Sequence, residues 1–446
     1  MNVAPSPKPR GPRGLPFFGS LFAWQKDPPE FFLRAREEYG DLVPFRMARQ
    51  QAYLVSRPEW IRDILVTHQH NFIKGAGLQW AKEFLGEGLL TSEAPLHTRQ
   101  RRLAQPAFHR QRISGYGATM VEHAARRMER WRDGQRMDLA HEMMALTLSI
   151  AGKTMFDAEV EDEAEGIGAA LTSLMHAFPD FASPLAAIKR RLPLPGNARL
   201  LKAKATIDAT IYRIIEERRQ DSRDRGDLLS MLMASQDEDG SQMTDTQLRD
   251  ECVTIFLAGH ETTANALAWT FYALSQKPAA EATLHAELDR VLAGRLPDVA
   301  DLKALPYTEA VLTESMRLYP PAWGFARRNK VAYEIGGITA PPMSSFITSP
   351  YVVHRDPRWY EDPLAFKPER WTEAFKAALP PFAYFPFGGG ARKCIGEGFA
   401  WMEGELLIAT LAGRYRFELT PDARVQHQAL ITLRLRHGVP VFLRAR

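Results

Sequence analysis

A pattern typical of one long helix runs without a proline over residues 244–276. It begins with TDTQ, in which Thr244 and Gln247 have the spacing of a capping box, and it ends before Pro278. About 33 residues at ~1.5 Å per residue make a rod of roughly 50 Å, which must cross the centre of the molecule. We therefore predict a fold built around this helix.

Helical periodicity also dominates the rest of the chain, as at residues 30–40, 117–134 and 197–220. Strand-like patterns are scarcer and lie toward both ends: 40–48, 51–56, 332–341, 344–353, 416–420 and 431–445. The fold class expected is mainly α with a minor β portion. Because strands from the two ends must pair within one fold, we expect a single domain over residues 1–446. A short proline-rich segment of about 20 residues begins it.

The composition excludes several classes of protein. The 57 basic and 53 acidic residues leave a net charge of +4, so no nucleic-acid partner is expected. Two cysteines, Cys252 and Cys394, do not make a disulfide framework, which favours a reducing compartment and a cytoplasmic location. No stretch has the ~18 apolar residues of a spanning helix, so we expect no integral membrane anchor. Residues 15–24 are apolar but short, and are predicted to pack on the protein body.

Cys394 lies in a glycine-rich loop, FPFGGGARKCIG, just before a helical pattern. A thiolate needs positive potential and hydrogen-bond donors, which a helix N-terminus and closely approaching glycine amides supply. Arg392 has the charge to bind a carboxylate of a cofactor, and Phe387 has the shape to cover a planar ligand. The alternative is a buried structural cysteine. A zinc site is disfavoured, because no second Cys or His lies at ligand spacing.

The loop fits the pattern F-x-x-G-x-R-x-C-x-G, which resembles the heme-binding loop of the cytochrome P450 superfamily, of soluble bacterial type. The resemblance implies the cytochrome P450 fold, with the long helix over the heme, and heme b (iron protoporphyrin IX) as cofactor. Cys394 would be the axial thiolate ligand of the iron, a ligand that favours O–O cleavage. The cofactor-binding residues that the resemblance implies are His97, Arg101, Ala258, Gly259, Arg327, Phe387, Gly388, Arg392, Cys394 and Gly396.

The middle of the long helix reads FLAGHETTANALAW, where a glycine and a polar block interrupt an apolar run. Buried polar groups destabilise a protein unless they have partners or a role. One explanation is a helix kink with threonines bonded back to the helix. The block also resembles the family's A-G-x-[D/E]-T signature. That resemblance implies that Glu261 and Thr262 are the catalytic acid–alcohol pair, which delivers protons during oxygen activation. Ala258 and Gly259 would leave space near the iron.

A second helical motif, APLHTRQRRLAQPAF, puts His97 and Arg101 four residues apart on one face. It resembles the family's propionate-binding helix. Arg392 and Arg327 would supply further cations, although Arg328 has a similar claim to the place of Arg327. The basic cluster around this helix is otherwise expected to be solvated.

The motif EAVLTESMRLYPP puts Glu314 and Arg317 three residues apart, which by itself describes an ordinary exposed ion pair. It resembles the family's E-x-x-R motif, with Arg370 in FKPERW as the third member. The resemblance implies a buried structural lock behind the heme, which serves folding and heme retention.

The resemblance implies an enzyme, a cytochrome P450 monooxygenase, which is an oxidoreductase that acts on paired donors and incorporates molecular oxygen. We expect it to insert one oxygen atom from O2 into a lipophilic small molecule, such as a fatty acid, a terpenoid or a carotenoid-like compound. Two alternatives are a peroxide-driven peroxygenase and a non-catalytic heme-binding or sensor protein. The presence of both Glu261 and Thr262 argues against them.

Electrons are expected from a separate ferredoxin or flavodoxin with its reductase, because about 50 residues after Cys394 leave no room for a reductase domain. Arg99, Arg102 and Lys393 would present positive charge to such an acidic partner. We expect the protein itself to be a monomer.

The substrate is expected to lie among mostly apolar residues from 72–90, 174–185, 256–263 and 320–325. The aromatic residues in these ranges include Trp80, Phe84, Phe178, Phe181, Trp323 and Phe325. His176 and His260 are candidates for contact with a polar end of the substrate. The proline-broken segment 180–203 is either a mobile cover over the site or a plain connector.

Overall fold

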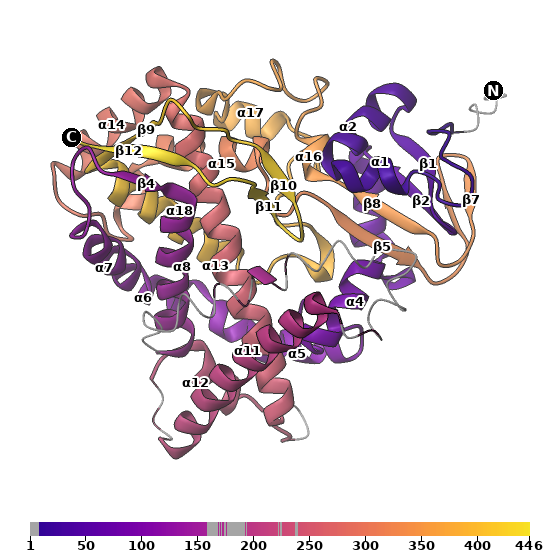
Figure 1. Ribbon diagram of the computed structural model, residues 1–446, viewed down its shortest axis with the longest axis horizontal. Helices are drawn as coiled ribbons and strands as arrows, with labels where there is room; N and C mark the ends of the chain where they lie inside the picture. Colours follow the sequence, from indigo (N-terminus) through magenta and orange to yellow (C-terminus); the bar gives the residue numbers. More distant parts are fainter. Residues whose placement is uncertain are drawn as a thin grey trace.

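In the computed structural model, one long helix, α13 (Asp245–Ser275), crosses the middle of the molecule (Figure 1). Its ends lie within one residue of the prediction. The predicted capping box is present: Gln247 N–H donates to Thr244 Oγ1 at 3.2 Å, and Thr244 N–H donates to Gln247 Oε1 at 2.9 Å. Most of the α13 side chains are buried, so tertiary packing stabilises this helix along its whole length.

The structure describes residues 9–446 apart from 158–167, 169, 171, 174, 176–191, 193, 222, 224 and 237–239. The predicted cover or connector at 180–203 therefore lies largely outside the described residues, and so do His176, Phe178 and Phe181. Within the described ranges, no helix combines the length and the apolar character that crossing a membrane requires.

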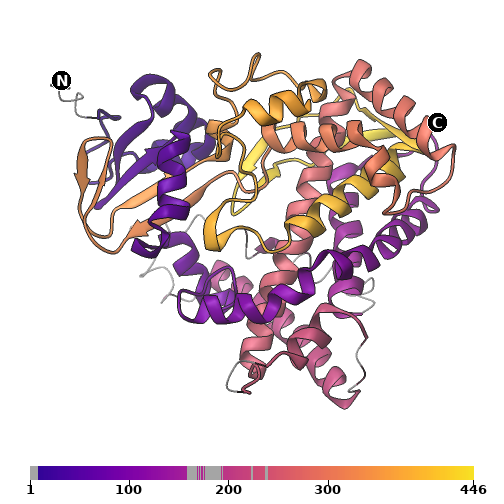
Figure 2. The ribbon, with the colours of Figure 1, turned by 180° about the vertical axis from the view of Figure 1, so that it is seen from behind.

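Helices surround α13 on several sides, and α8, α11, α15 and α18 pack directly against it. Figure 2 shows α18 crossing α13 from the other side of the molecule. The described helices besides α13 are α1 (Leu21–Lys26), α2 (Pro28–Tyr39), α3 (Pro58–Arg62), α4 (Ala76–Leu85), α5 (Leu96–Ala104), α6 (Arg110–Gly115), α7 (Gly117–Met128), α8 (Leu139–Phe156), α11 (Pro195–Gln220), α12 (Leu228–Ala234), α14 (Pro278–Leu292), α15 (Pro306–Leu318), α16 (Pro350–Val353), α17 (Glu373–Ala378) and α18 (Glu397–Ala412).

The strands form two main sheets and two hairpins. One sheet has the order β1-β2-β8-β5-β3 and the other β4-β12-β9, and the hairpins are β6–β7 and β10–β11. Only the β2–β8 pair is parallel among these ladders. The strands are β1 (Leu42–Met47), β2 (Gln50–Val55), β3 (Phe72–Lys74), β4 (Arg136–Asp138), β5 (Phe325–Asn329), β6 (Tyr333–Ile335), β7 (Ile338–Ala340), β8 (Ser345–Thr348), β9 (Tyr415–Leu419), β10 (His427–Ala429), β11 (Leu433–Leu435) and β12 (Pro440–Ala445).

This arrangement confirms the predicted fold class, mainly α with small sheets. Strands that are far apart in sequence do pair, as β2 with β8 and β4 with β12. One strand prediction was too long: 344–353 ends as a strand at Thr348, and Pro350 starts the short helix α16, since proline suits the first turn of a helix. Short β3, β4, β5 and β10 were not predicted.

The largest hydrophobic cluster surrounds α13 and contains buried residues of α5, α7, α8, α15 and α18. Two smaller clusters involve the five-stranded sheet, which lies at the end of the molecule near the N-terminus (Figure 1). The C-terminus lies at the opposite end, among the helices. The single-domain organisation stays a prediction.

Residues 15–24 only partly follow the expectation that they pack on the body. Leu21 and Trp24 are buried, but Leu15, Phe17 and Phe22 are exposed. An antiparallel bridge between Leu15 and Gly19 turns the chain back on itself before α1 begins, and this turn leaves the rings outside.

Candidate functional site

The loop before α18 is shaped by two glycines with left-handed backbone. Gly388 and Gly390 have φ of 72° and 69°, and a Cβ on Gly390 would collide with the carbonyl oxygen of Leu65. Ala391 N–H donates to Gln69 Oε1 at 2.8 Å, and Cys394 N–H donates to the Phe387 carbonyl at 3.0 Å. The loop is therefore held in one conformation, with Cys394 just before the first turn of α18.

Cys394 is exposed, although the surrounding protein desolvates its thiol. Burial raises the pKa of its thiol, whereas the Gly396 amide and the nearby Arg101 and Lys393 lower it. Glu397 also raises the pKa, and the net shift is upward, so the amide and the cations only partly offset burial. That Cys394 forms a thiolate stays a prediction.

A strip of α13 is also uncovered within an otherwise buried stretch. Ala258 is exposed and Thr262 half-buried, whereas Leu257, His260 and Glu261 are buried. A Cβ on Gly259 would lie 2.6 Å from the end of the Met155 side chain of α8. The open strip therefore includes Ala258 and Thr262, with the half-buried Gly259 beside them. That Ala258 and Gly259 leave space near an iron stays a prediction.

Glu261 is hydrogen-bonded away from Thr262. Arg434 of β11 donates from Nε to Glu261 Oε1 at 2.7 Å and from Nη2 to Oε2 at 2.8 Å, and Thr432 Oγ1 donates to Oε1 at 2.5 Å. The Thr262 hydroxyl donates to the Ala258 carbonyl at 2.7 Å. Between these two described residues, the predicted acid and alcohol, no hydrogen bond is formed.

Sequence reasoning missed Arg434 and Thr432. A signal was present, because Thr432 and Arg434 alternate with the buried Leu433 and Leu435, as expected when a strand presents two polar side chains on one face. The pattern does not show that these side chains bind Glu261, because Glu261 lies about 170 residues earlier in the chain.

The predicted cations gather between α5, β5 and the cysteine loop, but most have protein partners. Arg392 donates to the Ser92 carbonyl at 2.6 Å and pairs with Glu93 at 2.5 Å. Arg101 donates to the Lys393 carbonyl at 2.6 Å, which ties α5 to the loop. Burial and Arg392 lower the pKa of His97 to about 3, so its imidazole is neutral.

Arg327 differs from these, because it forms no ion pair in the part of the chain that the structure describes. Burial and the neighbouring Arg392 lower its pKa to about 10. Arg328, next in β5, points to the other face and donates to the Met343 carbonyl at 3.4 Å. Of the two arginines that the sequence left open, Arg327 is the one that lies with Arg392.

A buried lysine beside this cluster was not predicted. Lys74 of β3 donates from Nζ to the carbonyls of Leu89, at 2.7 Å, and Leu90. Burial, Arg392 and Arg327 lower its pKa to about 6. Glu93 and Glu251 lie close enough to oppose this shift, but they do not offset burial and the two arginines.

Two buried carboxyl groups on the helices also lack full hydrogen bonding. Glu251 of α13 accepts from Leu89 N–H at 3.0 Å, and burial raises its pKa to about 7. Glu403 of α18 lies next to Thr263; burial raises its pKa to about 8, and neither carboxyl oxygen has a well-formed hydrogen bond among the described residues. Burial therefore favours the protonated form of both carboxyl groups.

Glu314, Arg317 and Arg370 lie together, as the motif implies. Arg317 donates to both Glu314 oxygens at 2.8 Å, and Arg370 Nε donates to Oε1 at 3.1 Å. Trp371 Nε1 also donates to Glu314, at 2.9 Å. Glu314 and Arg317 are fully buried, so this is not the exposed pair that the spacing alone describes.

The predicted aromatic lining is only partly assembled. The rings of Trp80 and Phe84 of α4 are in contact at a tilt of 53°, with centroids 5.1 Å apart, and Phe325 lies against Gly388 of the cysteine loop. Trp323 instead donates to the Leu430 carbonyl at 3.0 Å. The buried His260 ring bonds to the Phe256 carbonyl at 2.7 Å, so nothing places it at a polar end of a substrate.

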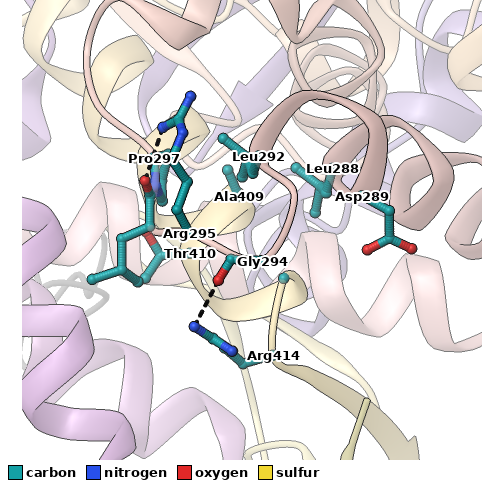
Figure 3. A pocket seen from close by; sticks show the side chains of 11 residues that line it. Leu288, Asp289, Leu292, Gly294, Arg295, Pro297, Ala409, Thr410 and Arg414 are labelled. Atoms are coloured by element: carbon teal, nitrogen blue, oxygen red, sulfur yellow. Dashed lines mark hydrogen bonds between the residues drawn. The ribbon is translucent and has the colours of Figure 1, made fainter.

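Figure 3 shows a small hollow of about 20 Å³ between the end of α14 and α18. Its walls include Asp289, Arg295 and Arg414, and Arg414 donates to the Gly294 carbonyl at 2.8 Å. None of the predicted site residues lines it, and its volume suits one or two water molecules. It is not the candidate site.

Comparison with known proteins agrees with this arrangement. The family described as Cytochrome P450 matches residues 9–434. "Cyclooctatin synthase" of Streptomyces melanosporofaciens is 38% identical over 95% of this chain and 92% of its own length. "Cyclooctat-9-en-7-ol 5-monooxygenase" of the same organism is 36% identical over 92% and 89%. "Pentalenene oxygenase" of Streptomyces avermitilis is 36% identical over 95% and 94%.

Among solved structures, retinoic acid-bound cyanobacterial CYP120A1 matches with a TM-score of 0.88, 24% sequence identity and 99% coverage of both chains. At this level of identity the likeness concerns the fold.

Proposed function

The chain belongs to the cytochrome P450 family, and on this premise we propose that it is a heme-thiolate monooxygenase that oxygenates a terpenoid-like lipophile. The family and the enzyme class follow from the whole-chain matches. The roles of individual residues, the substrate class and the redox partner are our proposals.

The residues present fit a heme. Cys394 offers a thiol with an amide donor and cations around it. Arg327 is a half-buried cation that forms no ion pair within the described residues, and burial and Arg392 lower its pKa to about 10 although Glu93 opposes them. A heme propionate would supply a counter-charge. We assign Cys394 as the iron ligand, and His97, Arg101, Arg327 and Arg392 to the propionate side.

When bound, heme supplies the oxygen-activating and electron-accepting chemistry, which a thiolate ligand tunes toward O–O cleavage. The chain supplies the orientation of the cofactor and the path of the protons. The uncovered strip of Ala258 and Thr262 on α13 is the surface that we assign to the reacting side, because these two side chains are accessible in the middle of an otherwise buried helix.

Thr262 and Glu261 are assigned to proton delivery. The Thr262 hydroxyl lies on the open strip, but the Glu261 carboxylate is bound to Arg434 and Thr432. A proton therefore passes from Glu261 to Thr262 only through water, or when the Glu261 side chain rotates away from β11. Arg434 thus controls when the acid is available.

The substrate class rests on the relatives and on the apolar lining. Two relatives are named for oxygenation of cyclooctat-9-en-7-ol and pentalenene, and they match 92% and 95% of this chain. The described lining residues Trp80, Phe84 and Phe325 are aromatic, which suits a compact hydrocarbon better than a charged chain end. We propose a terpenoid substrate rather than a fatty acid.

Electrons are proposed to come from a separate acidic ferredoxin or flavodoxin. Arg101 joins α5 to the loop of Cys394, so the exposed basic side of α5, with Arg102, lies next to the thiolate. A docked acidic protein would approach the iron there by the shortest path. The monomeric state and the cytoplasmic location stay predictions.

One observation carries the proposal: Cys394 lies in a glycine loop just before α18, with the Gly396 amide bonded to its desolvated thiol. The test is the difference spectrum of the dithionite-reduced protein with carbon monoxide. We expect the red-shifted Soret band of thiolate ligation, and its loss in Cys394→Ser. A band of histidine ligation, or a spectrum unchanged by that substitution, would overturn the assignment.

The substrate class is tested separately by titration of the ferric protein. A sesquiterpene or diterpene hydrocarbon is expected to shift the heme toward high spin, and a fatty acid of similar size is not. The reverse result would reject the terpenoid proposal and leave the monooxygenase intact. Product that forms with hydrogen peroxide but not with reductase and ferredoxin would favour the peroxygenase.

A further inference from the structure

His354 directly follows the short helix α16, and its imidazole is fully buried. The ring stacks on Tyr384, with centroids 5.0 Å apart, and meets the Phe385 ring edge-on at 5.5 Å. Phe385 is the first residue of the cysteine loop. The proposed iron ligand, propionate cations and structural lock do not include the His354 side chain. Because a buried polar ring destabilises a protein unless it has partners, the hydrogen bonds of His354 indicate what it does.

These hydrogen bonds determine which ring nitrogen carries the proton. Phe385 N–H donates to His354 Nε2 at 3.0 Å, so Nε2 is the acceptor and carries no hydrogen. Burial, Arg317 and Arg355 lower the pKa of His354 well below the usual value for histidine. The ring is therefore neutral, with its hydrogen on Nδ1. Nδ1 has no well-formed hydrogen bond among the described residues, although the backbone of Arg317 and Met316 lies close enough to oppose the shift.

The backbone of His354 is held by the structural lock. Arg317, which pairs with Glu314, donates from Nη1 to the His354 carbonyl at 2.8 Å. Glu314 and Arg317 belong to α15, so the His354 carbonyl is bound to α15 and the His354 ring is bound to the cysteine loop. One residue thus connects the buried ion pair with the start of the loop.

The Phe385 amide comes at the start of a short series of hydrogen bonds that ends at the cysteine. Gly388 N–H donates to the Phe385 carbonyl at 3.0 Å, and Cys394 N–H donates to the Phe387 carbonyl at 3.0 Å. A shift of Phe385 would therefore move the turn that accepts the Cys394 amide. Metal ligation is sensitive to displacements of this kind, because a ligand must be held close to its productive geometry.

We propose that His354 is a positioning residue for Cys394: its Nε2 holds the Phe385 amide and so keeps the cysteine loop in the shape that iron ligation requires. The proposal rests on the assignment of Cys394 as the iron ligand. Hydrogen bonds behind a metal ligand orient the ligand and tune the metal. The alternative is that the His354 ring only fills space between Tyr384 and Phe385.

Gln69 provides a matched control on the same loop. Ala391 N–H donates to Gln69 Oε1 at 2.8 Å, but this hydrogen bond is exposed to solvent. Water can replace the Gln69 side chain, whereas the Phe385 amide belongs to a residue that is 4% exposed and would lose its partner. Loss of the acceptor should therefore matter at His354 and not at Gln69.

The test uses the purified, heme-loaded full chain. His354→Phe keeps a planar ring without an acceptor, whereas His354→Gln loses the ring but keeps an acceptor of similar reach. In the dithionite-reduced protein with carbon monoxide, we expect His354→Phe to raise the ratio of complexes without the red-shifted thiolate band to complexes with it by about tenfold or more. His354→Gln should restore most of the band, and Gln69→Ala should leave the spectrum unchanged.

Thermal unfolding verifies that each variant is folded. If His354→Phe does not fold, His354→Gln is compared with His354→Asn, whose shorter side chain does not reach the Phe385 amide. We expect the thiolate band in the first and its loss in the second. A band retained in His354→Phe, or equal spectra of His354→Gln and His354→Asn, would overturn the proposal and leave a packing role. A wild-type protein without the band would instead reject Cys394 as the iron ligand, which is a separate failure.

Discussion

At the scale of single residues, the two side chains assigned to proton delivery are held by different interactions. Thr262 lies on the open strip of α13 with its hydroxyl bonded to Ala258, and Glu261 is held in an ion pair. The Thr262 hydroxyl can donate to a group on the open side only when it breaks its hydrogen bond to the Ala258 carbonyl. Replacing Thr262 tests whether this hydroxyl is needed.

We expect Thr262→Ala to retain heme and to consume electrons, but to form less product per electron. The missing hydroxyl interrupts proton delivery without removing any contact that holds the cofactor. The measurement is the ratio of product formed to NAD(P)H oxidised, with Thr263→Ala as control, since Thr263 is buried and donates to the Gly259 carbonyl. Unchanged coupling in Thr262→Ala would refute the relay.

Glu403 gives a prediction for stability against pH. Its pKa is raised by burial to about 8, above its unfolded value, so the native state binds the proton more tightly than the unfolded state. The free energy of unfolding therefore falls as pH rises from about 4.5 to about 8, because the native state must keep or lose this proton at a cost. Glu403→Gln should make this decrease smaller by on the order of a few kcal/mol.

Chemical denaturation at several pH values measures this effect. The control is Glu281→Gln, which removes a second buried carboxylate, on α14, that is paired with Arg416 of β9. If Glu403→Gln follows the same pH dependence as the wild-type protein, then Glu403 is solvated by water and ionised in the native state.

At the scale of elements, buried carboxylates join parts of the chain that do not touch in sequence. Glu314 ties α15 to Arg370 and Trp371, and Glu261 ties α13 to β11. In both cases one carboxylate satisfies several donors. Removing it leaves buried donors without a partner.

We expect Glu314→Ala to lower the free energy of unfolding by roughly 3–5 kcal/mol, because Arg317 would remain buried without its counter-charge. Heme retention should fall in parallel. Thermal or chemical unfolding measures the loss. Glu309 lies on the same helix as Glu314 and forms a partly exposed ion pair with Lys376 of α17. Glu309→Ala should therefore change the free energy of unfolding by no more than about 1 kcal/mol. Equal effects of the two substitutions would contradict the structural lock.

Arg434 should behave as a positioning residue for Glu261. Arg434→Gln is expected to lower coupling and to change the pH profile of turnover, and Arg434→Lys should restore part of both. The double variant Glu261→Gln, Arg434→Gln should be more stable than Arg434→Gln alone, because no uncompensated carboxylate remains. A pH profile that none of these changes alters would limit Arg434 to a structural role.

Local patterns predicted much of these elements. The capping box of α13 and the glycine loop of Cys394 depend on residues within a few positions, and both were visible in the sequence. The partner of Glu261 was not, because Arg434 comes from a strand far along the chain. The contact between Gly259 and Met155 was also hidden, since it depends on the approach of another helix.

The sequence left open whether Arg327 or Arg328 lies near Arg392, because neighbouring arginines are chemically equal. Side chains alternate between the two faces of β5, and the pairing of β5 with β3 and β8 places Arg327 near Arg392. Lys74 was missed for the same reason: a three-residue strand gives too weak a pattern to predict.

At the scale of the whole molecule, two sheets connect distant parts of the chain. β4 pairs with β12, and β2 with β8, so segments near the start are held by segments from the middle and the end. We therefore predict one cooperative unfolding transition. Far-ultraviolet circular dichroism and tryptophan fluorescence should give the same midpoint. Two separate midpoints would contradict the single-domain prediction.

The parallel pairing of β2 with β8 also affects how the protein is made. The β1–β2 hairpin leaves the ribosome about 290 residues before β8, which at ~5–20 residues per second is a delay of roughly 15–60 s. During that time the β2 edge has no neighbour and can pair with other chains. Synthesis of this enzyme therefore includes a period in which a chaperone that covers the nascent hairpin would raise the yield of native protein.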